Sequence, residues 1–182
     1  DYNSNTATLS TEKGEHDLAE FNTLFLRPTL KHYVSETLTF QYGLELNKDS
    51  GTGARIKGKP HIQDIAAFIS SEYRPFDKLT LRPGVRFLKN SVYDAPKFVP
   101  ALNTKFDITK NLDLRLSYAK GYRAPALREL YFDFVDASHA IIGNENLRAE
   151  TSNSWNSTIS WQKLHQEKNY LHKVNLSSFY NV

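Results

Sequence analysis

Apolar and polar residues alternate in steps of two through most of the chain. In the segment ETLTFQYGLELN (36–47), every second residue is apolar, from Leu38 to Leu46, and the intervening residues are polar or glycine. This period is that of an extended strand with one apolar and one polar face. The pattern recurs along the chain and predicts eight strands, near residues 18–31, 35–47, 61–74, 78–90, 97–108, 111–122, 150–164 and 168–182.

The predicted strands are long, and their connections alternate between short and long. Most strands run 11 to 15 residues, against about five or six in an ordinary sheet. Because proline cannot donate to the ladder, Pro28, Pro83 and Pro100 are expected to weaken three of them. Short connections at one end of the sheet face long loops at the other, which is typical of an up-and-down membrane barrel. The long loops lie near 1–17, 48–60, 91–96 and 123–149.

Aromatic and charged residues favour the membrane barrel over its alternative. Two aromatic groups fall near opposite strand ends, as expected for the two bilayer interfaces: Tyr73, Trp161 and Tyr170; and Tyr118, Tyr122, Trp155 and Tyr180. The polar face would then line a lumen with Arg82, Arg86, Lys105, Asp107, Asp113 and Arg115. The alternative is a soluble antiparallel β-sandwich, a binding module that contacts a protein or glycan through loop 123–149.

Composition and the absence of certain motifs argue against two classes of function. The 23 basic and 20 acidic residues are interspersed, so we expect no nucleic-acid partner. The mean hydropathy of −0.54 remains compatible with a barrel, because every second residue faces a polar interior. The sequence contains no G-x-S-x-G, H-E-x-x-H or phosphate-binding glycine motif, and we expect no enzyme activity.

The segment AKGYRAPALRELYFDFVDASHAIIGNENLRAE (119–150) breaks the two-residue period. Pro125 can open a helix at its first position. Apolar residues then follow at helical spacing and predict an amphipathic helix of about ten residues: Leu127, Leu130, Tyr131 and Phe134. A loop of this kind at a barrel mouth is a natural place for ligand contacts, although Leu127 and Leu130 are expected mainly to pack the loop against the wall.

Two boxes in this segment resemble those of TonB-dependent outer-membrane receptors. Residues 122–125, Tyr-Arg-Ala-Pro, resemble the family's FRAP-type box, and residues 144–147, Asn-Glu-Asn-Leu, its NPNL-type box with Glu145 in place of proline. The resemblance is closest to haem- and cobalamin-type receptors and to versions common in Bacteroidetes. It implies an all-β, antiparallel segment (1–182) of a larger plugged barrel in the bacterial outer membrane. The plug and its TonB-contacting box are not expected within this chain.

The resemblance also implies a function and a set of partners. The intact receptor would take up a scarce nutrient chelate, namely haem, cobalamin or siderophore iron, bound by extracellular loops and lumen. Its partners would be outer-membrane lipid, TonB through the plug, and a surface lipoprotein. No intrinsic cofactor is expected, since haem or cobalamin would be the transported substrate.

The predicted ligand contacts lie in the loop between and around the two boxes. Haem receptors carry a proposed axial histidine between the boxes, and His139 is the histidine in that interval. The aromatic side chains suit stacking on a flat macrocycle, or packing within the loop. Arg123 suits a structural hydrogen-bonding fork better than a substrate clamp. Calcium is a weaker candidate, at Asp133, Asp136 and Glu145. The ligand-binding prediction comprises Tyr122, Arg123, Tyr131, Phe132, Phe134, His139, Asn144 and Asn146.

Overall fold

The computed structural model describes residues 18–135, 137–138, 140–165 and 170–182. Long strands dominate it, with one short helix between the seventh and eighth. The strands are β1 (Ala19–Leu26), β2 (Thr29–Tyr33), β3 (Leu38–Gly53), β4 (His61–Phe76), β5 (Leu79–Asn90), β6 (Phe98–Thr109), β7 (Leu112–Arg123), β8 (Phe134–Val135), β9 (Ala140–Ile141), β10 (Glu150–His165) and β11 (Tyr170–Asn181); the helix is α2 (Leu127–Tyr131).

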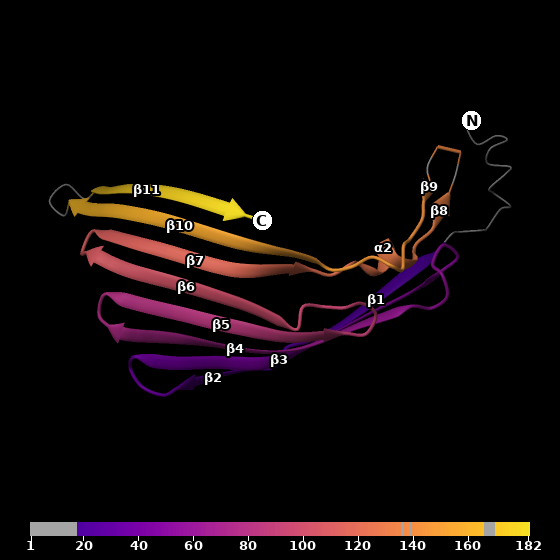
Figure 1. Cartoon of the computed structure of the whole chain (residues 1–182), viewed down its shortest axis with the longest axis horizontal. Coiled ribbons are helices and arrows are strands. Elements are labelled where there is room, and N and C mark those ends of the chain that lie inside the picture. Colours follow the sequence, from indigo (N-terminus) through magenta and orange to yellow (C-terminus); the bar gives the residue numbers. More distant parts are fainter. Residues whose placement is uncertain (1–17, 136, 139, 166–169) are drawn as a thin grey trace.

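The long strands form one antiparallel sheet in the order β1-β3-β4-β5-β6-β7-β10-β11 (Figure 1). Each predicted strand is present, but the first is divided. Pro28 interrupts the segment predicted as one strand near 18–31, and β2 pairs with β3 on the far side of the break. Pro83 and Pro100 stay inside β5 and β6, where they pair with Leu102 and Val85.

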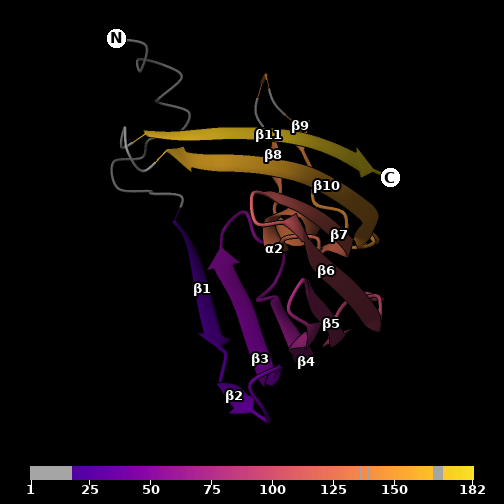
Figure 2. The same ribbon diagram turned by 90° about the vertical axis from the view of Figure 1, so that its left-hand side faces the viewer.

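The sheet is a curved wall, not half of a sandwich. Figure 2 shows its strands following an open arc. Apolar side chains on one face remain exposed, including Leu44 at 59% and Leu116 at 47%. In the described part of the chain the only other sheet is the small β8–β9 pair, so no second layer covers this face. The described residues therefore do not form the two-layered sandwich of the alternative.

The two ends of the wall differ as the alternation of loop lengths predicts. Residues 34–37, 77–78 and 110–111 make short connections at one end. Longer segments, 54–60, 91–97 and 124–149, gather at the other. The loop predicted near 48–60 is shorter than expected, because β1 pairs with β3 as far as Gly53. The loop predicted at 1–17 lies outside the described residues.

The aromatic group near the long loops forms a row on the apolar face. The rings of Tyr118 and Trp155 are 5.2 Å apart, and those of Trp155 and Tyr180 are 5.9 Å apart. Tyr122 does not extend this row, because its hydroxyl oxygen is buried. Near the short turns, Tyr73 is 43% exposed. Of the helices that the structure describes, none has the length and apolar character needed to traverse a membrane.

Candidate functional site

Helix α2 is half as long as predicted. It ends at Tyr131, because Phe132 adopts an extended backbone (φ −96°, ψ 124°) and forms a β-bridge with Ile56. Phe134, predicted on the same helical face as Leu127, lies in strand β8 instead. The helical spacing is present in the sequence, but pairing with a distant loop takes the backbone hydrogen bonds that a longer helix would need.

Arg123 and Glu129 brace the start of the helix. The Glu129 Oε2 atom accepts a hydrogen bond from the Ala126 N–H at 2.8 Å, and its Oε1 atom pairs with Arg123. Arg123 also reaches Glu150 Oε1 at 3.2 Å. The Ala126 N–H, followed by the Arg123 guanidinium, holds the pKa of Glu129 below its usual range. Arg123 thus forms the fork that the sequence favoured for it.

The apolar face of the helix packs onto the wall. Leu130 is fully buried and Leu127 is 7% exposed, and the two form one buried cluster with Ile62 of β4. Phe21, Tyr93 and Tyr131 pack around this cluster. Gly51 of β3 makes the approach possible, since a Cβ atom there would lie 2.8 Å from a Leu127 methyl group. The packing role expected for Leu127 and Leu130 is confirmed.

The described residues of segments 54–60 and 124–149 join to form a structure that we call the cap. The Lys57 N–H donates to the Tyr131 carbonyl at 3.0 Å, and the Asp133 N–H donates to the Arg55 carbonyl at 2.9 Å. Lys57 Nζ lies 3.3 Å from Asp133 Oδ2. The Arg55 guanidinium stands 4.0 Å from the Phe134 ring centre. Two loops distant in sequence are therefore paired as adjacent strands are.

Several predicted ligand contacts take part in building the cap. Phe132 and Phe134 contact the opposite loop, and the Asn144 N–H donates to the Glu129 carbonyl at 2.9 Å. Asn144 Oδ1 in turn accepts from the Asn146 N–H at 2.9 Å. The ligand-binding roles of these residues remain predictions.

Among the residues that the structure describes, the predicted metal ligands do not form a cluster. His139 and Asp136 lie outside those residues. Within them, no three His, Cys, Asp or Glu side chains are placed to hold a metal ion. Asp133 and Glu145 are the two described members of the calcium prediction, and Asp133 pairs with Lys57 and accepts from the Gly143 N–H at 2.9 Å.

Buried donors lie where the wall meets the cap. Among the described side chains, Arg86 Nε, the Tyr93 hydroxyl and the Tyr122 hydroxyl are buried without a hydrogen-bond partner. Burial, followed by the neighbouring Tyr122, raises the pKa of Tyr93 above its ordinary value. Tyr122, a predicted ligand contact, is thus partly enclosed by the protein itself.

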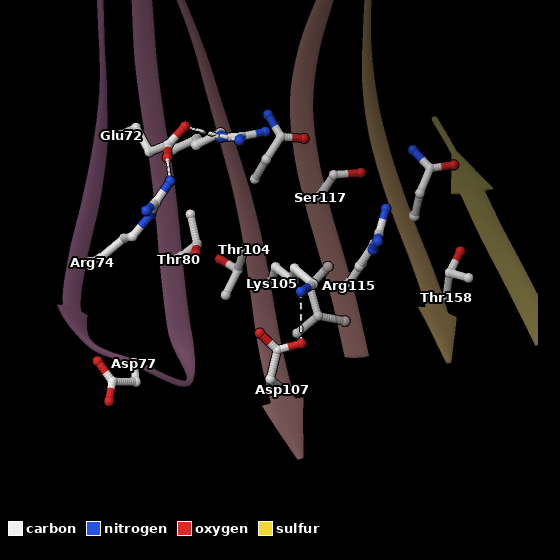
Figure 3. Close-up of a pocket in the computed structure, with 14 residues that line it drawn as sticks. Glu72, Arg74, Asp77, Thr80, Thr104, Lys105, Asp107, Arg115, Ser117 and Thr158 are labelled. Atoms are coloured by element: carbon white, nitrogen blue, oxygen red, sulfur yellow. Dashed lines mark hydrogen bonds and ion pairs between the residues drawn. The ribbon is translucent and has the colours of Figure 1, made fainter. Parts of the chain in front are cut away.

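The concave face near the short turns carries a band of charge around a cavity of about 910 Å³ (Figure 3). Glu72 lies 2.5 Å from Arg74 and 2.8 Å from Arg82. Lys105 lies 2.6 Å from Asp107. The predicted lumen residues Arg82, Lys105, Asp107 and Arg115 all line this cavity.

Sequence reasoning missed two parts of the charged face. Glu72 and Arg74 occupy alternate positions of β4, so the two-residue period of the sequence could have assigned both to the polar face. The other is Glu45, whose side chain is 8% exposed and lies 3.0 Å from Arg27 and 2.6 Å from Arg86. Arg27 lies between β1 and β2 and Arg86 lies in β5, so the residues that neighbour Glu45 in the sequence did not indicate the cluster.

A curved antiparallel wall, apolar outside and charged inside, with long loops capping one end, defines part of a transmembrane β-barrel. The chain belongs to the TonB-dependent receptor β-barrel family. The model of this family, described as "TonB dependent receptor-like, beta-barrel", matches residues 1–182. Members of this family are outer-membrane proteins, and this chain is part of an outer-membrane barrel.

Solved structures share this wall. The siderophore receptor PirA from Pseudomonas aeruginosa is similar over 90% of this chain and 31% of its own, with a TM-score of 0.76 and 20% identity. A mutant (G324V) of the ferric enterobactin receptor PfeA, also from Pseudomonas aeruginosa, is similar over 90% of this chain and 27% of its own, with a TM-score of 0.71 and 17% identity. At these identities the likeness shows the fold.

One curated relative is similar in sequence. The hemoglobin and hemoglobin-haptoglobin-binding protein of Haemophilus ducreyi is 35% identical over 94 residues, which cover 48% of this chain and 9% of that protein. The chain therefore spans less than a third of the solved receptors and about a tenth of this relative.

Proposed function

We propose that the chain contributes wall and cap to a receptor that imports iron, carried as haem or as a siderophore chelate, with energy supplied through TonB. The observation that carries this proposal is the family match over residues 1–182. The haemoglobin-binding relative supports haem, and the two siderophore receptors support a chelate. In this function the protein is a transporter and performs no catalysis.

The geometry supports different roles for the two ends of the wall. The cap stands over the end with the long loops, where a solute arrives from outside. The charged band near the short turns faces the lumen, where a plug domain would contact it through ion pairs and hydrogen bonds. Large outer-membrane barrels have polar interiors that can be plugged, and in the proposed function a solute would be released inward when the plug rearranges.

For the predicted ligand contacts, we propose that His139 is the haem-specific residue. A neutral imidazole is a ligand that haem iron accepts. Tyr131, Phe132 and Phe134 would supply aromatic surface from the cap, and Tyr122, Arg123, Asn144 and Asn146 would supply polar contacts. Cobalamin remains a third candidate solute, and a surface lipoprotein a candidate partner.

Growth tests the function directly. A strain lacking the complete receptor would be grown with hemin, haemoglobin or ferric enterobactin as the sole iron source, and separately with limiting cobalamin. We expect the deletion to abolish growth on one iron source, and we expect a second strain lacking TonB to show the same defect. Unimpaired growth of the receptor deletion on every iron source would overturn iron uptake.

Hemin titration of the purified receptor then separates haem from siderophores. Haem ligation predicts a Soret band that shifts on binding and is lost in His139→Ala. The matched control is His32→Ala, which changes an exposed histidine of β2 far from the cap. Equal Soret spectra for the wild type and both variants would remove His139 from the haem site.

A further inference from the structure

We propose that the cap, made of the described residues of segments 54–60 and 124–149, is rigid and that its two loops stay joined while solute enters and leaves. The two loops would not part as a lid does, and solute would pass beside them. That the two loops stay joined does not depend on which solute is transported. The passage of solute beside them rests on the proposed function.

Strand-like pairing is the first observation behind this proposal. The bridge between Ile56 and Phe132 is flanked by the two backbone hydrogen bonds of Lys57 and Asp133. Backbone pairing fixes the register of the two segments, which a single side-chain contact does not. The pairing also ends helix α2, so the conformation of the longer loop depends on the shorter one.

Side chains beside the bridge hold the same two segments together. The Lys57–Asp133 ion pair and the Arg55–Phe134 contact each join one segment to the other. Asp133 extends the connection, since its Oδ1 atom accepts from the Gly143 N–H beyond strand β9. The β8–β9 hairpin is thereby tied to loop 54–60 as well as to its own loop.

The wall anchors the joined loops. Leu127 and Leu130 are buried against Ile62, and Arg128 stands 4.5 Å from the ring centre of Phe21 in β1. Figure 1 shows α2 beside the loop ends of these strands. Lifting the longer loop would expose both leucines and break its pairing with loop 54–60 together. A motion that costs all of these contacts at once is unfavourable, so the cap remains a single body.

A disulfide across the bridge tests the proposal, because this chain contains no cysteine. Paired Cα atoms of an antiparallel bridge lie about 4.5–5.5 Å apart, within disulfide range. In the complete receptor, cleared of any other cysteine, Ile56→Cys and Phe132→Cys would be combined. We expect the pair to oxidise nearly completely without substrate, and the oxidised and reduced forms to take up hemin or ferric enterobactin at equal rates.

Truncation of two packed side chains needs its own control. The matched variant combines Ile56→Ser with Phe132→Ser and has the same loss of volume without a bond. A second control joins Ser157→Cys to Ser178→Cys, a wall pair whose hydroxyl oxygens are 2.9 Å apart. Uptake that falls at least tenfold on oxidation of the cap pair alone, and returns with reductant, would overturn the proposal.

A distance measurement tests whether the cap is rigid, even if the receptor transports none of these solutes. Spin labels at Lys59 and Val135, one in each loop, would be compared with and without hemin, haemoglobin or ferric enterobactin. We expect one narrow distance distribution in the free receptor, unchanged by any solute that binds. A broad distribution in the free receptor, or a shift on binding, would refute a rigid cap. Absent uptake with a narrow distribution would count only against the proposed function.

Discussion

The wall and the cap use apolar residues in opposite ways. On the wall, Leu44 is 59% exposed on the face that meets lipid, and backbone ladders hold the strands. In the cap, Leu130 is fully buried, and side-chain packing holds helix α2 in place. Leucine therefore contributes to insertion in one region and to folding in the other. The comparison predicts that the same substitution will have different effects in the two regions.

The largest expected effect is the loss of packing in the cap. Leu130→Ala should destabilise the cap by about 2–5 kcal/mol, because it leaves a cavity where the leucine was buried. Hydrogen exchange of residues 124–149 in the intact receptor would measure this as faster opening. Leu44→Ala is the matched control on the lipid face and should leave exchange in the cap unchanged. Equal protection of the cap in Leu130→Ala and the wild type would contradict the packing role.

A charge introduced on the lipid face should lower the free energy of unfolding by nearly as much as the loss of Leu130. Ile69 lies in the middle of β4 and is 42% exposed, and an arginine at the bilayer midplane of a barrel costs about 2–4 kcal/mol. Ile69→Arg should lower the free energy of unfolding from vesicles by this amount. Gln41→Arg, on the lumen face of neighbouring β3, should cost far less. Equal costs would mean that the two faces are wrongly assigned.

Acidification should loosen the cap through Glu129. Its pKa is lowered in the folded state, so its stabilising effect is complete above the unfolded value of about 4.3 and is lost as pH falls through the lower folded value. We expect protease cleavage in 124–149 to increase below about pH 4 in the wild type. In Glu129→Gln this part of the pH dependence should be absent. An unaltered pH profile in that variant would exclude Glu129 as its source.

The smallest expected effect belongs to the exposed ion pair between Lys57 and Asp133. Lys57→Ala should destabilise the cap by at most about 1 kcal/mol, since solvent screens such pairs. Hydrogen exchange at residues 131–133 would detect it, with Lys105→Ala on the lumen wall as the control. A cost above about 2 kcal/mol would show that the pair is more than a surface contact.

Much of the wall could be predicted from local pattern. Side chains of a strand alternate between its two faces whatever the strand pairs with, so the period of two placed Leu44 and Arg82 on opposite faces. Prolines were a weaker guide. Pro28 interrupts a strand, whereas Pro83 and Pro100 are accommodated within theirs.

The cap could be predicted only in part. The packing of Leu127 and Leu130 followed from their spacing, and the fork of Arg123 from its chemistry. The early end of the helix did not, because the partner of Phe132 is Ile56, more than 70 positions earlier in the chain. Glu45 was missed for the same reason, since Arg27 and Arg86 meet it only after the strands have paired.

The sequence by itself determined the strands, the two chemical faces of the wall and the alternation of short and long connections. These features depend on residues a few positions apart, whose geometry the backbone sets directly. The tertiary structure decided where helix α2 stops, which loops join, and which charges are buried together. Those features depend on residues brought close only when distant strands align, where competing hydrogen bonds and packing outweigh local preference.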